Sequence, residues 1–92
     1  MGNVNVKIKL MPSSPDTNLE EIKEKAKSLI EEGEGTNVHF EEEPIAFGLK
    51  AVMVFFTWPE EKELEKLENA LEKIDNVVSK QVIDMRRAIG NA

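Results

Sequence analysis

The segment from Pro44 to Gly48 has a composition that is unusual for its expected place in the fold. It reads Pro-Ile-Ala-Phe-Gly and lies between two stretches with strand character. Proline cannot continue an interior strand because it lacks a backbone N–H, and glycine permits the positive φ of a tight connection. Turns are normally built from polar residues. The apolar Ile45 and Phe47 are therefore either folded back into the core or offered to a binding partner.

Two adjacent arginines, Arg86 and Arg87, form a second group that could do chemistry. A guanidinium group matches the geometry of phosphates and carboxylates, so the pair could bind either one. The formal net charge of the chain is −6, and the two cations could equally be solvated surface residues. The residue types alone leave both readings open.

Residues that commonly perform acid–base or nucleophilic catalysis are scarce. The chain has no cysteine and no tyrosine, and its one histidine, His39, has no convergent set of partners. A strand histidine beside the glutamates at 41–43 is most simply a solvated surface residue. The glycines at 33 and 35 lack the flanking pattern of a phosphate-binding loop. We therefore expect no enzyme active site, no metal site and no cofactor.

Composition favours a protein partner over nucleic acid or membrane. A net charge of −6 repels nucleic acid and anionic lipid in general and suits a basic protein. No apolar run approaches the ~20 residues of a membrane span, and the N-terminus lacks the pattern of a signal peptide. The absence of cysteine suits a reducing compartment, so we expect a cytoplasmic protein. Ninety-two residues predict one domain over 1–92.

The hydrophobic pattern predicts four strands. Two segments alternate apolar and polar residues, which is typical of half-buried strands, and a last segment carries the apolar residues Val78, Val82, Ile83 and Met85. A fourth is apolar almost throughout and predicts a central strand covered on much of both faces. In chain order the predicted strands cover 3–11, 36–43, 49–57 and 77–87.

Two further segments have the apolar spacing of amphipathic helices. The first is expected to begin where Thr17 and Glu20 match the capping-box pattern and to end at Gly33. The second is expected to begin at Pro59, because proline suits a first turn and the two acids that follow complement the helix dipole. Each helix would have about 16 residues.

The order βαββαβ predicts an α+β, ferredoxin-like sandwich, with two helices on one face of a four-stranded antiparallel sheet. Right-handed crossovers place the first and third strands in the centre. This fold hosts many activities. RNA-binding versions carry stacking aromatics on central strands, and Phe55 and Phe56 lie on one. Their glycine, basic and aromatic signature is missing here, so we expect no direct nucleic-acid binding.

The residues also resemble a known family. The segment Glu43–Lys50 is similar to the central motif of the translation elongation factor 1-beta family in its short archaeal form. The opening Val-Lys-Ile-Lys-Leu-Met-Pro-Ser-Ser-Pro-Asp and the closing Asp-Met-Arg-Arg at 84–87 fit the same family. Eukaryotic members are longer, so the resemblance implies that this chain carries the exchange domain without their N-terminal docking modules.

The resemblance implies a guanine-nucleotide exchange factor for elongation factor 1-alpha, the GTPase that delivers aminoacyl-tRNA. In the family, an aromatic of this loop wedges against the nucleotide domain of the GTPase, and Phe47 matches it. A basic residue near the C-terminus approaches the magnesium and phosphate-loop region, and Arg87 aligns best, with Arg86 close behind. The expected partner-binding residues are Pro44, Ile45, Phe47, Gly48, Lys50, Arg86 and Arg87.

Two hypotheses therefore remain. An exchange factor must bind the nucleotide-free GTPase more tightly than the loaded one, and an apolar wedge with a nearby cation would supply that difference without covalent chemistry. It predicts an exposed Phe47 in a protein that is monomeric when free. The alternative is a ligand-sensing or oligomerising ferredoxin-like module without a GTPase partner. It predicts a buried Phe47, a small-molecule pocket or a self-associating sheet edge.

Overall fold

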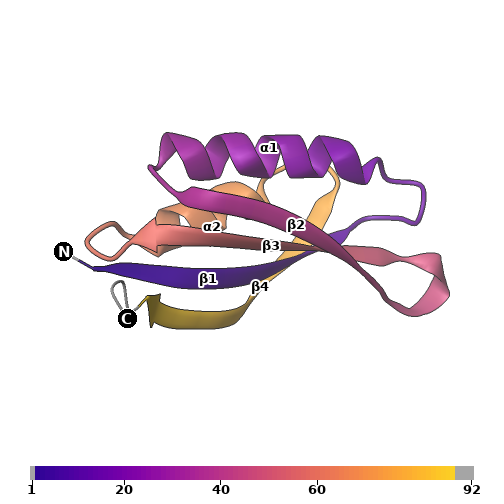
Figure 1. Cartoon of the computed structure of the whole chain (residues 1–92). Helices are drawn as coiled ribbons and strands as arrows, with labels where there is room; N and C mark the ends of the chain where they lie inside the picture. Colours follow the sequence, from indigo (N-terminus) through magenta and orange to yellow (C-terminus); the bar gives the residue numbers. More distant parts are fainter. Residues whose placement is uncertain (1, 89–92) are drawn as a thin grey trace.

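Four strands form one antiparallel sheet, and both helices lie on the same face of it (Figure 1). The computed structural model describes residues 2–88. Neighbouring strands follow the order β2-β3-β1-β4, so the predicted placement of the first and third strands in the centre is confirmed. The elements are β1 (Asn3–Pro12), α1 (Leu19–Glu32), β2 (Thr36–Pro44), the short helix η1 (Ala46–Gly48), β3 (Lys50–Pro59), α2 (Leu64–Glu72) and β4 (Val77–Ala88).

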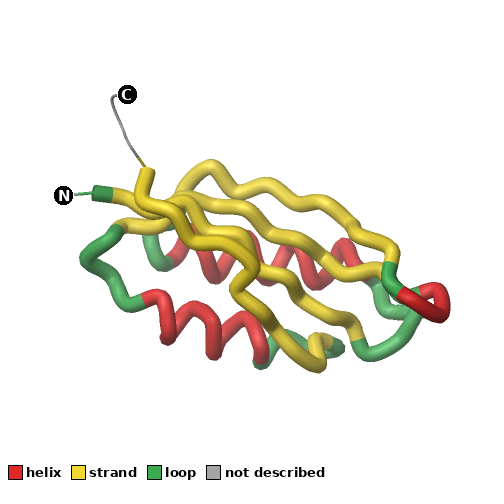
Figure 2. Tube along the Cα trace, turned by 90° about the horizontal axis from the view of Figure 1, so that it is seen from below, coloured by secondary structure: helices red, strands yellow, loops and turns green. Residues whose placement is uncertain are grey.

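The core lies between the sheet and the helices. Alternate residues of the two central strands point toward the helices, which meet them with one apolar stripe each. Burying one such aliphatic or aromatic side chain stabilises the fold by about 1.5–3 kcal/mol. The opposite face of the sheet carries no helix (Figure 2). The buried core consists of Val6, Ile8, Leu10, Ile22, Ala26, Ile30, Val52, Val54, Phe56, Trp58, Leu67, Leu71, Ile74 and Val77.

The predicted start of the second helix at Pro59 is wrong. Pro59 is the last residue of β3, where it pairs with Asn3, and the helix begins only at Leu64. Proline is tolerated here because β2 begins at Thr36, opposite Thr57, and does not extend alongside Pro59, so no neighbour on that side needs an N–H from it. The second helix therefore has 9 residues rather than about 16. Neither helix of the described range is long and apolar enough to cross a membrane.

The cap of α1 lies one residue later than predicted. Asn18 is the N-cap, and its side-chain oxygen accepts a hydrogen bond from the backbone N–H of Glu20 at 3.0 Å. The Thr17 hydroxyl instead accepts from the backbone N–H of Ser14 at 3.3 Å, inside the preceding turn. The capping-box prediction for Thr17 is therefore wrong, although the helix does end at Gly33.

A substitution at Gly33 can test how closely the end of α1 approaches Trp58 on β3. A Cβ atom at Gly33 would lie 2.9 Å from Cζ3 of Trp58 and would overlap Cη2. Its φ of −86° suits alanine, so the close contact alone decides the outcome. We expect Gly33→Ala to lower the free energy of unfolding by about 1–3 kcal/mol, measured by urea denaturation with the fluorescence of Trp58. The exposed Ser28→Ala is the control, expected to change it by less than about 0.5 kcal/mol; equal stability of both variants would contradict the close approach.

Candidate functional site

Phe47 lies at the tip of the connection between β2 and β3, and 93% of its side chain is exposed. It is the most exposed of the large hydrophobic residues in the described range. The reading in which its ring plugs the end of the sheet is therefore excluded. An exposed aromatic ring at a hairpin tip is a surface that a binding partner can cover.

The backbone of the tip turns Phe47 outward. Phe47 has φ 61° and ψ 32°, and Gly48 has φ 79°, so two consecutive residues are left-handed. The N–H of Ile45 donates to the carbonyl of Leu49 at 2.7 Å, and the N–H of Leu49 donates to the carbonyl of Ala46 at 3.2 Å. A left-handed residue with a Cβ costs roughly 1–2 kcal/mol, so these bonds hold Phe47 in a strained conformation. The glycine conformation was predicted, but that of Phe47 was not.

The other predicted hairpin residues surround the tip. Pro44 and Lys50 face each other as the last β2–β3 pair, and both are exposed. Ile45 is half-buried. A Cβ atom at Gly48 would lie 3.9 Å from Cβ of Pro15, so the connection after β1 runs beside the tip. The structure thus brings the five predicted hairpin residues together.

The hairpin projects beyond the rest of the sheet (Figure 1). The pairing of β1 with β3 ends at Leu10 and Val52, whereas that of β2 with β3 continues to Pro44 and Lys50. Past Val52, β3 therefore pairs with β2 alone, and these two strands form a two-stranded ribbon. We call residues 43–51 the hairpin arm.

The two arginines lie at the opposite end of the sheet. Arg87 pairs with Val4 and Arg86 with Asn5, near the start of β1. Trp58 also pairs with Val4, and the eight residue steps from Lys50 to Trp58 span about 26 Å. The structure therefore does not bring Phe47 and the arginines together.

Both arginines are exposed and each contacts a carboxylate. Nη2 of Arg87 lies 2.6 Å from Oε2 of Glu60, and Nε of Arg86 lies 3.0 Å from Oδ2 of Asp84. The side chains of Arg86 and Arg87 are 80% and 72% exposed. Exposed ion pairs contribute about 0–1 kcal/mol, so either guanidinium can leave its carboxylate for a partner at little cost.

His39 belongs to the face of the sheet without helices. Its ring stacks on that of Phe55 on β3, with centroids 4.5 Å apart. On the other side of β3, Nζ of Lys7 on β1 lies 5.2 Å from the centroid of the Phe55 ring. Beside them an open hollow of ≈ 530 Å³ is crossed by hydrogen bonds from Asn37 to Thr57 and from Thr57 to Asn5. These groups already satisfy one another. Within residues 2–88 no three His, Asp or Glu side chains gather as metal ligands.

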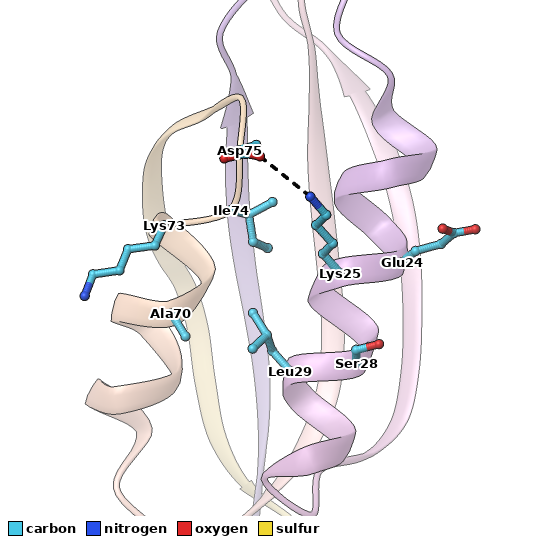
Figure 3. Close-up of a pocket in the computed structure, with 8 residues that line it drawn as sticks. All are labelled: Glu24, Lys25, Ser28, Leu29, Ala70, Lys73, Ile74 and Asp75. Atoms are coloured by element: carbon cyan, nitrogen blue, oxygen red, sulfur yellow. Dashed lines mark ion pairs between the residues drawn. The ribbon is translucent and has the colours of Figure 1, made fainter.

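A second hollow, of ≈ 510 Å³, lies between the two helices (Figure 3). Leu29 of α1 and Ile74 after α2 line it, and the ion pair between Lys25 and Asp75, 3.8 Å apart, joins its two walls. In Figure 3 the charged ends of Glu24 and Lys73 point away from the hollow. Among the described residues, no set of polar groups converges inside this hollow, so it does not compete with the hairpin as the candidate site.

The sequence is similar to those of known proteins. The family model of the EF-1 guanine nucleotide exchange domain matches residues 5–88. A protein named elongation factor 1-beta from Methanosarcina barkeri is 47% identical over 88 residues, which are 95% of this chain and 99% of that protein. Another of that name, from Methanocaldococcus jannaschii, is 39% identical over 89 residues, which are 96% and 100% of the two chains.

A solved structure has the same fold. The 30S ribosomal protein S6 of Thermotoga maritima, a ferredoxin-like protein, matches with a TM-score of 0.64 over 98% of this chain and 91% of that one. At 17% identity this likeness bears on the fold alone, and it confirms the predicted α+β, ferredoxin-like sandwich. The family match extends over the hairpin arm and both arginines. The chain therefore belongs to the EF-1 guanine nucleotide exchange domain family.

Proposed function

We propose that this chain is a guanine-nucleotide exchange factor that promotes GDP release from elongation factor 1-alpha by means of Phe47. Its membership of the exchange-domain family supports the activity. The observation that carries the role of Phe47 is its 93% exposure at a strained hairpin tip. The domain extends over residues 1–92, and it regulates a GTPase without catalysing a reaction of its own.

Exchange requires only a difference in affinity between two states of the GTPase. GTPases hold GDP through a phosphate loop and a magnesium ion, and a protein that binds the nucleotide-free state more tightly drives GDP off. Burial of the Phe47 ring supplies about 1.5–3 kcal/mol when the receiving apolar surface is open. Because the tip is already fixed by hydrogen bonds, little conformational entropy is lost on binding.

The separation of the two sites favours two separate contacts on the GTPase. About 26 Å of strand lies between Lys50 and the end that carries the arginines, so one nucleotide cannot meet both. We assign the magnesium and phosphate region to Arg87, with Arg86 beside it, and a distinct apolar surface to Phe47. Pro44, Ile45, Gly48 and Lys50 then frame the contact made by Phe47.

The edges of the sheet support a protein that is monomeric when free. The β2 edge carries three consecutive exposed glutamates, residues 41–43, and charge on an edge opposes pairing with a second copy. The β4 edge is interrupted twice, where Val78 and Ile83 are extra residues in its pairing with β1. The net charge of −6 likewise favours a protein partner over nucleic acid or membrane.

The first test separates activity from stability at Phe47. Phe47→Asn removes the ring, and asparagine tolerates the left-handed backbone better than phenylalanine. We expect GDP release from elongation factor 1-alpha, followed with a fluorescent GDP analogue, to slow by about 10- to 100-fold at subsaturating concentrations. The free energy of unfolding should stay equal or rise by up to about 1 kcal/mol.

Val78→Ala provides a matched control, because Val78 is an apolar residue that is 60% exposed on the β4 edge, which β1 separates from the hairpin strands. It should exchange GDP like the wild-type protein. No acceleration of GDP release by the wild-type protein would refute the exchange function itself. Full acceleration by Phe47→Asn would refute only the role of the ring.

A second test addresses the arginine end. Arg87→Ala removes a charged donor that we place near the phosphates, and such a hydrogen bond contributes about 1.5–3 kcal/mol, or roughly 10- to 100-fold in rate. The loss should shrink when magnesium is chelated. Because the two ends lie far apart, the effects of Arg87→Ala and Phe47→Asn on the activation free energy should add. Lys66→Ala, which removes an exposed cation on α2, is the control. An equal loss of exchange rate in Arg87→Ala with and without magnesium would contradict this assignment.

A further inference from the structure

The hairpin arm has little sheet to support it. A two-stranded ribbon is marginally stable in water and twists more than a wider sheet. The arm begins at the pair Glu43–Ala51, one step beyond the last pairing of β1 with β3. Besides the connection after β1, which runs beside Gly48, the contacts at the base of the arm set its direction and therefore the position of Phe47.

One such contact lies on the helix face of the sheet. Glu42 is opposite Val52, whose side chain is fully buried beneath the helices. Nζ of Lys23 on α1 donates a hydrogen bond to Oε2 of Glu42 at 2.8 Å and a second to Glu20 at 3.2 Å. The bond to Lys23 lowers the pKa of Glu42, and the same bond raises the pKa of Lys23. Both groups are therefore charged at neutral pH.

The next residue makes the matching contact on the other face. Glu43 points to the face without helices, because successive strand residues alternate. Its Oε1 lies 3.8 Å from Nζ of Lys9 on β1. Since β3 lies between β1 and β2, this ion pair crosses β3, between Ala51, opposite Glu43, and Met53, opposite Lys9. The small side chain of Ala51 leaves room for the crossing, and it is fully buried.

We propose that Glu42 and Glu43 are positioning residues for Phe47, held from opposite faces of the sheet by Lys23 and Lys9. This pair of contacts, which we call the clamp, favours one direction of the hairpin arm relative to the arginine end. The inference rests on the proposed exchange function. The clamp requires no contact between these four residues and either the nucleotide or the GTPase.

The geometry shows why direction matters. Phe47 is four residues beyond Glu43, and an extended chain of that length spans at most roughly 13 Å. A swing of the arm by about 20°, comparable with the twist between neighbouring strands, would therefore move the ring by up to roughly 4 Å. A partner that must engage both ends of the molecule at once would then meet only a fraction of correctly directed arms. Its apparent affinity falls in proportion to that fraction.

The first experiment uses Glu42→Gln/Glu43→Gln, which keeps the side-chain shapes and removes both ion pairs. We expect the concentration for half-maximal GDP release to rise by about 3- to 10-fold with the limiting rate unchanged, because the competent fraction falls. Lys25→Gln/Asp75→Asn removes a remote ion pair of the same 3.8 Å length as that of Glu43, and should behave like wild type. An unchanged half-maximal concentration in the clamp variant would overturn the proposal.

Charge reversal distinguishes positioning from direct contact. Glu42→Lys alone and Lys23→Glu alone should each weaken exchange, while the double variant Lys23→Glu/Glu42→Lys restores an ion pair of reversed sign. We expect the double variant to recover most of the lost affinity. If Glu42 instead touched the GTPase, the double variant would stay as weak as Glu42→Lys, and the positioning role would be wrong.

A measurement on the free protein separates failure of the clamp from failure of the exchange function. The amide protons of Ile45 and Leu49 close the tip, so we expect their hydrogen exchange to accelerate by at least about threefold in Glu42→Gln/Glu43→Gln and not in Lys25→Gln/Asp75→Asn. Unchanged hydrogen exchange of these two amides in Glu42→Gln/Glu43→Gln would refute the clamp, whatever the GDP release of that variant. Should wild-type protein fail to release GDP, only the proposed function would be lost, and this measurement would still decide the clamp.

Discussion

The antiparallel pairing of β1 with β3 is the contact on which the rest of the molecule depends. It buries alternate side chains of both strands against the helices. The two places where this pairing stops also define the two proposed binding sites, the hairpin arm and the arginine end. Where the pairing ends at Leu10 and Val52, the hairpin arm continues without support from β1. At its other limit the pairing extends to Asn3 and Pro59. There β4 runs alongside β1 and places the two arginines at that end of the sheet.

How much the sequence predicts depends on whether the cause is local. Strand positions and topology were predicted because period-two alternation and short connections are local signals. The start of α2 was missed because Pro59 is held in the sheet by Asn3, which lies far away in the chain. The hairpin was predicted from its composition and its family resemblance. The left-handed backbone of Phe47 was not predicted, because phenylalanine has no preference for that conformation. The clamp was missed because Lys9 and Lys23 approach neighbouring glutamates only in the folded chain.

Strain at Phe47 and the ion pairs at the base of the arm act in opposite directions on stability. A left-handed phenylalanine destabilises the free protein, and such strain persists only where the surrounding structure over-determines it. The hydrogen bonds of Ile45 and Leu49 do so at the tip. The glutamates at 42–43 do so at the base, because their partners come from two different layers of the fold. A ring that is both exposed and held in place is difficult to explain by folding alone.

Rigidity is the property that an exchange factor of this kind needs most. A flexible wedge would adapt to the loaded and the nucleotide-free GTPase alike, and a ligand with equal affinity for two states shifts neither. A fixed ring can match only one of them, so discrimination grows with stiffness. The separation of the two ends by about 26 Å of strand strengthens this requirement, because a partner that contacts both ends tolerates little error in the direction of the arm. In the proposed function, the part of the chain that acts on the GTPase is a hydrocarbon ring whose position matters more than its chemistry, and no catalytic side chain is required.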